Sequence, residues 1–319
     1  MADPITYLDH AVDVLAQVAA YARTGRRFVL ATSVDIKGGS ARDIGSLAVI
    51  SEDGFMTGYM SNGCIDRDIL LQGLSCLEQG QPKLLRYGAG SPFSDLILPC
   101  GGALAVWIDP DPDVPALLTA YEKLRDRRAT TLTFEPHGKD YADPLTICYQ
   151  PKVSLTLAGR GAIFRSTVRI AQASGLEVFA YSPDEADLKA VFPFCIQAPT
   201  HMRSQNDIGA LKLDAHSAVL TLFHDHDWEP DFLKAALATP ARFIGALGSR
   251  KTHAARIETL LELGVSPQDA QRVRGPIGLI PSLRDANFIA VSALAEIAQS
   301  FAYEQQKQIR PDVKIVRTA

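Results

Sequence analysis

The sequence predicts an α/β protein of two domains and a tail. We expect an N-terminal α+β domain over 1–150, a C-terminal Rossmann-like domain with a doubly wound parallel sheet over 151–306, and a C-terminal tail over 307–319. Three observations predict this. The 319 residues suffice for about two domains of ordinary size. Strand and helix patterns alternate after Pro151, which is typical of a parallel sheet. The first half instead mixes paired strands with helices.

The composition is that of a globular protein with a sizeable core. Apolar residues make up 47% and charged residues 21%, and the net charge of −4 gives no sign of nucleic-acid binding. The opening "MADPITYLDHAVDVL" has no secretory pattern, and no apolar run approaches the ~18 residues of a membrane span. Five widely spaced cysteines fit reduced thiols in a cytoplasmic protein, and no CxxC or HExxH spacing predicts a metal site.

The elements of the first half follow from its apolar patterns. A first helix carries apolar residues at helical spacing and ends at Gly25, and "FVLATSV", "SLAVIS" and "FMTGYM" read as strands. A second helix follows, with Ser61 or Asn62 as its cap and Gly80 at its end. The remaining strand patterns are "KLLRYG", "ALAVWI", "TTLTFEPH" and "PLTICYQP".

The second half alternates more regularly. The segments "VSLTLAGRG", "EVFAYS", "AVLTLFH" and "ARFIGALGS" predict buried strands separated by helical patterns. "RKTHAARIETLLELG" is a strong helix, and a last helix runs from about Asp285 to Gln306. The order of these elements predicts the doubly wound sheet.

Cys64 is the first candidate for chemistry. It follows Asn62 and Gly63 at the start of the second helix, where free amides and the helix dipole favour a thiolate and an anionic ligand. Cys100, Gly101 and Gly102 form a second candidate loop, in which glycines allow close approach of a ligand or simply make a turn. The other reading of Cys64 is a small buried hydrophobic residue, which we expect instead for the three remaining thiols: Cys76, Cys148 and Cys195.

Ser40 and Arg42 lie in the glycine-rich loop "DIKGGSARDIG". A guanidinium offers a planar fork of donors that suits a phosphate or an oxyanion. A solvated arginine on a surface loop is the alternative.

Gly159 and Gly161 fit the first two positions of a dinucleotide fingerprint after a strand. Phe164 stands at the third glycine position, and the next strand ends in Tyr181 and Ser182 where an acidic residue would bind a ribose. The pattern therefore indicates a Rossmann-like fold more than nicotinamide chemistry.

Two further loops follow predicted strands. His224, oriented by Asp225, comes at the carboxyl end of one strand, where ligands gather in such sheets. Ser249 and Arg250 open a helix after the next strand and form a candidate anion cradle. The alternative for the cradle is an exposed basic first turn, although cations are unfavourable at that end of a helix.

Taken together, these motifs resemble the XdhC/CoxI family, accessory proteins of molybdenum hydroxylases. The resemblance rests on "GGSARDIGS", "GYMSNGCID", "LPCGG", "AGRG", "IGALGSRKTHAARI" and "GPIGL…IAVSALAEI", which occur in the family's order over nearly the whole chain. The sequence departs from the family pattern at Ala41, which replaces a proline, at Phe164, and in "GLIPSLRDAN", which lacks the usual element before the last helix.

The resemblance implies a chaperone that binds molybdenum cofactor, as molybdopterin or its dinucleotide form, helps its sulfuration and inserts it into an apo molybdenum hydroxylase. Cys64 and Cys100 then become candidates to hold the cofactor or its exchangeable sulfur. A cysteine desulfurase is the second expected partner and a homodimer the expected assembly. We expect no enzyme, since no nucleophile, base and orienter are arranged together. The alternatives are an NAD(P)-dependent oxidoreductase using Gly159, Gly161 and His224, and a scaffold without ligand.

Overall fold

The computed structural model divides the chain into two compact units, Met1–Lys152 and Val153–Ala319. The structure describes five stretches of the chain, with side chains as far as residue 302: 3–40, 42–88, 101–136, 143–223 and 227–308.

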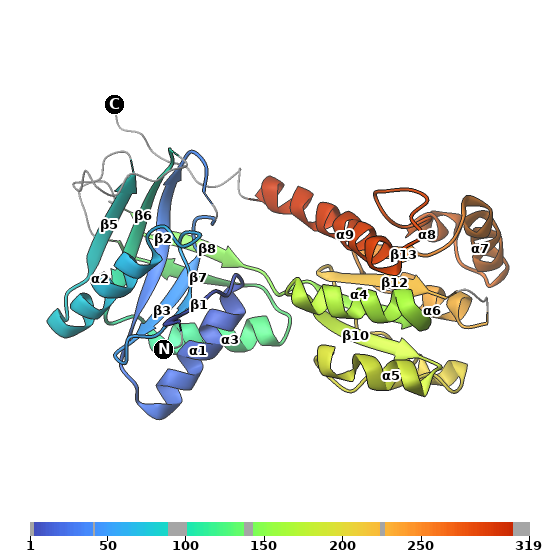
Figure 1. Cartoon of the computed structure of the whole chain (residues 1–319), viewed down its shortest axis with the longest axis horizontal. Coiled ribbons are helices and arrows are strands. Elements are labelled where there is room, and N and C mark those ends of the chain that lie inside the picture. Colours follow the sequence, from blue (N-terminus) through green and yellow to red (C-terminus); the bar gives the residue numbers. More distant parts are fainter. Residues whose placement is uncertain (1–2, 41, 89–100, 137–142, 224–226, 309–319) are drawn as a thin grey trace. The chain divides into compact units, whose positions relative to one another are not determined.

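The first unit contains a six-stranded sheet in the order β1-β4-β3-β2-β6-β5 (Figure 1). Only β1 and β4 are parallel neighbours, and the other pairs are antiparallel. β7 and β8 form a separate antiparallel pair. The strands are β1 (Ile5–Thr6), β2 (Phe28–Lys37), β3 (Leu47–Ser51), β4 (Met56–Gly58), β5 (Lys83–Gly88), β6 (Ala103–Asp109), β7 (Thr130–Phe134) and β8 (Leu145–Tyr149).

Three helices cover the two faces of this sheet. They are α1 (Ala11–Thr24), α2 (Asp66–Gln79) and α3 (Val114–Arg125). One apolar cluster packs α2 on one face, and another packs α1, α3 and the β7–β8 pair on the other. Gly25 and Gly80 end their helices with left-handed backbone, as predicted, because glycine adopts that conformation without steric cost. The α+β prediction for this half is confirmed; α3 is an addition to it.

The second unit has an all-parallel sheet in the order β11-β10-β9-β12-β13-β14. In chain order this is 3-2-1-4-5-6, the order of a dinucleotide-binding doubly wound fold, so the predicted architecture is confirmed. The strands are β9 (Ser154–Gly159), β10 (Glu177–Ser182), β11 (Thr200–His201), β12 (Ser217–Leu222), β13 (Phe243–Ala246) and β14 (Val273–Arg274).

Helices cover both faces of this sheet (Figure 1). One apolar cluster joins α4, α5 and α9 to the sheet, and the other joins α6, α7 and α8. The central strands β9 and β12 are buried along their whole length because both of their faces are covered. In the stretches with described structure, no helix is long and apolar enough to cross a membrane. The helices are α4 (Gly161–Ala173), α5 (Glu185–Val191), α6 (Glu229–Leu237), α7 (Arg250–Glu262), α8 (Pro267–Ala270) and α9 (Ala286–Gln308).

Candidate functional site

The candidate loops of the first unit leave its sheet at one end. Because β1 and β4 are parallel, the segments after Thr6 and Gly58 emerge together. β2 also ends there, since its antiparallel partner β3 begins there. Lys37 at the end of β2 pairs with Ala103 at the start of β6, so residues 101–102 reach the same end. The strand register thus gathers the segments that follow β1, β2 and β4 with the one that precedes β6.

The glycines of two motifs pack backbone against backbone. A Cβ on Gly38 would lie 3.3 Å from Gly102 Cα, and a Cβ on Gly88 would lie 2.1 Å from the Gly102 carbonyl oxygen. Gly101 has left-handed backbone with φ 69°. These contacts explain the glycines structurally. A ligand role for Gly101 and Gly102 stays a prediction, and Cys100 lies outside the described residues.

Arg42 is already engaged by neighbours. Its Nη1 and Nη2 donate to Asp9 Oδ1 at 2.7 Å and to the Asp9 carbonyl at 2.8 Å, and its guanidinium lies 4.4 Å from the ring centre of Tyr59. The side chain is 8% exposed, and its buried Nε has no hydrogen-bond partner among the described residues. Ser40 Oγ accepts the Arg42 amide. Arg42 therefore ties its loop to the segments after β1 and β4, and its predicted phosphate contact is left with few free donors.

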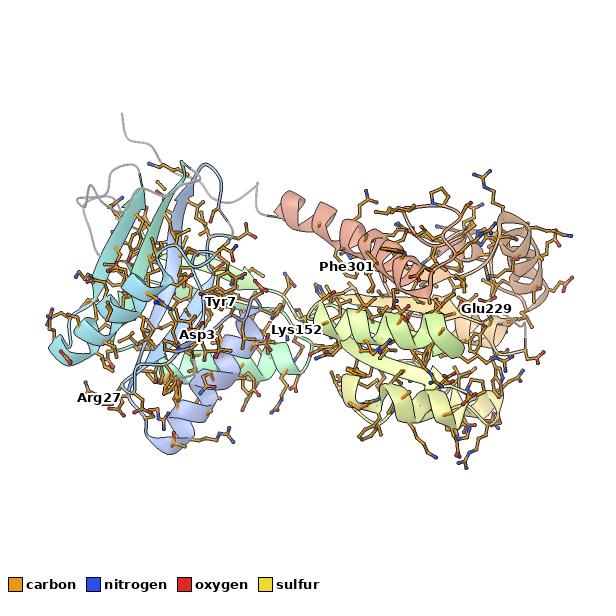
Figure 2. All side chains as sticks on the ribbon, viewed as in Figure 1. Asp3, Tyr7, Arg27, Lys152, Glu229 and Phe301 are labelled. Carbon is orange, nitrogen blue, oxygen red and sulfur yellow. The ribbon has the colours of Figure 1, made fainter. Side chains whose placement is uncertain are left out.

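Two tyrosines continue this cluster to the Cys64 loop. The rings of Tyr7 and Tyr59 lie 5.3 Å apart, and Tyr59 donates to the Asp9 carboxylate. That hydrogen bond, followed by burial, raises the pKa of Tyr59. Desolvation and then the charge of Asp66 raise the pKa of Tyr7, which is 46% exposed (labelled in Figure 2). The Tyr7 hydroxyl lies 3.9 Å from the Cβ position of Gly63, so the aromatic pair adjoins the Cys64 loop.

The Cys64 loop is wound around the carboxylate of Asp66. Asp66 is fully buried and accepts the amides of Met60, Ser61 and Gly63 at 2.8–2.9 Å, together with the Ser61 hydroxyl. Ser61 Oγ in turn accepts the amide of Ile65 at 3.0 Å. The capping prediction for Ser61 or Asn62 is wrong: the N-cap of α2 is Ile65, without a side-chain cap. The loop amides expected to face a ligand bind an internal carboxylate instead.

Cys64 itself is exposed, directly before this N-cap. The reading as a buried hydrophobic residue is therefore wrong. The other first-turn carboxylate, Asp68, accepts from the buried Tyr87 hydroxyl at 2.7 Å. With both acids turned to internal donors, no side chain caps the first turn of α2. An exposed thiol thus stands directly before a helix start that has no side-chain cap and carries two carboxylates, Asp66 and Asp68, in its first turn.

The other three thiols differ in burial. Cys76 is buried, as predicted, and Cys195 is half-buried with its pKa raised to about 11 by burial. Cys148 is exposed, so its core prediction is wrong. β8 belongs to a two-stranded ribbon in which alternate side chains face solvent, and Cys148 lies on that outer face.

In the second unit, Gly159 and Gly161 lie at the switch point between β9 and β12. A Cβ on Gly159 would lie 2.8 Å from Leu222, so the neighbouring strand requires this glycine. Gly161 begins α4 with φ 80°, and its amide donates to Asp187 at 2.7 Å. Phe164 is fully buried between α4 and the sheet. The departure from the fingerprint at Phe164 therefore has a packing reason.

The remaining candidates lie past β12 and β13. His224 and Asp225 are outside the described residues. Ser249 caps α7 by accepting the Thr252 amide at 3.1 Å, and Arg250 is exposed in the first turn. An anion site at Ser249 and Arg250 therefore stays a prediction.

A buried polar network, missed by the sequence reasoning, lies behind this edge. Glu229, labelled in Figure 2, accepts from Thr221 Oγ1 at 2.7 Å and from Arg256 Nε at 2.9 Å. Arg256 also donates to the Leu247 carbonyl, and His253 Nδ1 lies 3.3 Å from Arg256 Nη1. Burial and then the charge of Arg256 lower the pKa of His253. In the part of the chain described, no cluster of His, Cys, Asp and Glu is arranged to hold a metal ion.

Family profiles match both halves of the chain. The profile described as "XdhC and CoxI family" matches residues 21–88, and the profile "XdhC Rossmann domain" matches residues 155–297. The molybdenum cofactor insertion chaperone PaoD of Escherichia coli K12 is 29% identical over 90% of this chain and 88% of its own. The uncharacterized protein YqeB of the same organism is 23% identical over 90% of this chain and 46% of its own.

The fold is also found among solved structures. A crystal structure described as a xanthine dehydrogenase from Bacillus halodurans superposes with a TM-score of 0.74 and covers 93% of this chain and 97% of that one. At 21% identity, this likeness shows the fold alone. With one family profile matching in each unit, the chain belongs to the XdhC and CoxI family.

Proposed function

We propose that this protein is a chaperone that binds molybdenum cofactor and inserts it into an apo molybdenum hydroxylase. The family and the similarity to PaoD support a chaperone of this cofactor. The observation that carries the proposal is the exposed Cys64 on a loop fixed by the buried Asp66. A ligand site needs a donor that is accessible and held in place, and this loop provides both.

The residues present suit the chemistry of this cargo. A thiolate is a soft donor for a sulfur-rich metal centre. Cys64, with Asn62 and Gly63 exposed beside it, would meet the ligand. Arg42 would act by holding its loop against Tyr59 and Asp9 rather than by binding phosphate with a free guanidinium.

The finer parts of the proposal follow from the resemblance. They are a role for Cys64 and Cys100 in holding the cofactor or its exchangeable sulfur, a cysteine desulfurase as partner in sulfuration, a homodimeric assembly and a cytoplasmic location. Binding and delivery, without turnover, would be the activity. The rival NAD(P)-dependent oxidoreductase would need a phosphate at the start of α4, where Asp187 already binds the Gly161 amide.

A loading experiment tests cofactor binding. The protein is purified from cells that make the cofactor and oxidised, and the fluorescent pterin product is measured per protein chain. We expect near-equimolar pterin in the wild type, a loss of about tenfold or more in Cys64→Ala, and no loss in Cys148→Ser, which removes another exposed thiol. Equal pterin in all three proteins would contradict the site, and no pterin in the wild type would contradict the function.

Delivery needs a separate measurement. An apo molybdenum hydroxylase is incubated with free cofactor, with loaded wild-type protein or with the Cys64→Ala variant, and its activity is followed over time. We expect faster and more complete activation from the loaded wild type. Activation by free cofactor at the same rate would leave a binding protein without an insertion role.

A further inference from the structure

The second unit fills its own phosphate position with a carboxylate. Asp187 of α5 is 2% exposed. Its Oδ2 accepts the amide of Gly161, the first residue of α4, at 2.7 Å, and its Oδ1 pairs with Arg165. In a sheet of this strand order, the pyrophosphate of a dinucleotide sits at the start of the helix after the first strand. That helix is α4, so Asp187 stands where the pyrophosphate would stand.

The surroundings show why α4 accepts this carboxylate. The N-cap Arg160 makes no side-chain cap, and the first turn of α4 contains no acidic residue. Free amides and the dipole at a helix start favour a negative charge. Asp187 supplies that charge from 26 positions further along the chain, and Arg165 balances it. The Asp187 carboxylate therefore supplies the negative charge that a bound phosphate would otherwise bring to the start of α4.

The ribose side is occupied as well. Asp184, the nearest acid after β10, caps α5 by accepting the amides of Ala186 at 2.7 Å and Asp187 at 3.2 Å. Ser182, at the end of β10, is fully buried and accepts the Asp184 amide. The acid that could hold a ribose thus fixes the backbone of Asp187 instead.

We infer that Asp187 is a specificity-determining residue that makes the second unit reject nucleotide diphosphates, NAD(P) included. A phosphate approaching Gly161 would meet a carboxylate already bonded to its amide, and like charges repel at contact distance. Removing the charge should turn the start of α4, with Arg165 beside it, into a site for inorganic pyrophosphate and ADP. The inference does not rest on the proposed cofactor function, and the Cys64 loading experiment stays independent of it.

Titration calorimetry with pyrophosphate, ADP and NADH tests this on the full-length chain. Wild type, Asp187→Asn, Asp187→Ala and Glu185→Gln are compared, the last removing an exposed charge from the same helix. We expect no saturable binding to wild type or Glu185→Gln. We expect saturable binding of pyrophosphate and ADP to both Asp187 variants, about tenfold or more tightly than the weakest binding that the titration detects.

Saturable binding of NADH or ADP to the wild type, weakened by Arg165→Met, would overturn the inference. So would a folded Asp187→Asn variant, checked by circular dichroism, that binds neither pyrophosphate nor ADP. Should both Asp187 variants fail to fold, the Gly161 amide resonance of the wild type decides. Movement of that resonance on adding ADP would overturn the inference, and no movement would support it.

Discussion

Each unit buries an aspartate beside a turn with ligand-binding potential, but the two carboxylates do opposite things. Asp66 accepts amides from its own loop, within six positions, and lies behind that loop. Cys64 is left facing solvent. Asp187 accepts from Gly161, far away along the chain, and lies over the helix start itself.

The difference lies in where the carboxylate sits relative to the backbone. A carboxylate behind a loop shapes that loop through its hydrogen bonds, so the outer surface stays available to a ligand. A carboxylate over a helix start occupies the positive end to which a ligand would bind. This difference supports the proposed ligand site in the first unit. In the second unit the carboxylate satisfies the helix start internally, and Glu229 and Arg256 also pair in the interior.

Breaking that interior pair should give the largest effect on stability. Arg256→Met leaves Glu229, 2% exposed, without its cation, and an uncompensated buried charge costs about 3–5 kcal/mol. Urea unfolding of the full chain, followed by the fluorescence of Trp228 in a Trp107→Phe background, measures this loss in the second unit.

Arg250→Met is the matched control, because Arg250 is exposed on the same helix. It should change the free energy of unfolding by less than about 0.5 kcal/mol. The double variant Arg256→Met with Glu229→Gln should recover part of the loss, since no charge then remains buried alone. Equal stability of Arg250→Met and Arg256→Met would contradict an internally satisfied edge.

Asp66→Ala should have the next largest effect, in the first unit. It removes the acceptor of four hydrogen bonds and leaves buried donors unpaired, at a cost of about 2–4 kcal/mol. Urea unfolding followed by Trp107 fluorescence in a Trp228→Phe background measures it, and hydrogen exchange of residues 60–65 should accelerate. Asp68→Ala, which removes the hydrogen bonds from Tyr87 and Gln72 and none from the loop, is the control. Unchanged exchange in this loop would show that Asp66 does not shape it.

A pH-dependent effect in the first unit should be smaller. His10 Nδ1 caps α1 by accepting the Val12 amide, and burial, followed by Lys152, lowers the pKa of His10 to about 4. Asp13 opposes this shift and Arg42 adds to it. The unfolded chain therefore binds this proton first, so stability is complete above pH ~6.5 and falls as the pH drops towards 4, by about 1–3 kcal/mol.

Hydrogen exchange of the α1 amides at pH 7.5 and pH 5, corrected for intrinsic rates, measures this loss of protection. His10→Asn keeps a capping side chain without a titrating group, so the difference between the two pH values should shrink. A variant with the same pH difference as the wild type would exclude His10 as the source.

The sequence predicted what depends on local pattern. Continuous apolar runs gave β9 and β12, and glycines gave the ends of α1 and α2. The sequence analysis did not predict α3, although its signals are local: Asp113 caps the helix and a proline lies in its first turn. The role of Asp66 was also within reach, since its donors lie within six positions of it.

The role of Asp187 could not be predicted in this way. It depends on sheet order, which places α5 beside α4 and brings together residues 26 positions apart. The Arg42 cluster is similar, because Asp9 is 33 positions from Arg42 and 50 from Tyr59. Cys148 was misplaced because a strand pattern does not reveal which face of a two-stranded ribbon is covered.

The smallest effect on stability should come from replacing Cys64, the residue proposed to meet the ligand. Cys64 is exposed and makes no hydrogen bond with the described residues, so Cys64→Ser should change the free energy of unfolding by less than about 0.5 kcal/mol. Cys76→Ser places a hydroxyl in a site 2% exposed and should cost about 1–3 kcal/mol. Urea unfolding of the two variants side by side measures both. A loss in Cys64→Ser as large as in Cys76→Ser would mean that the thiol supports the loop, and the first unit would then be as internally satisfied as the second.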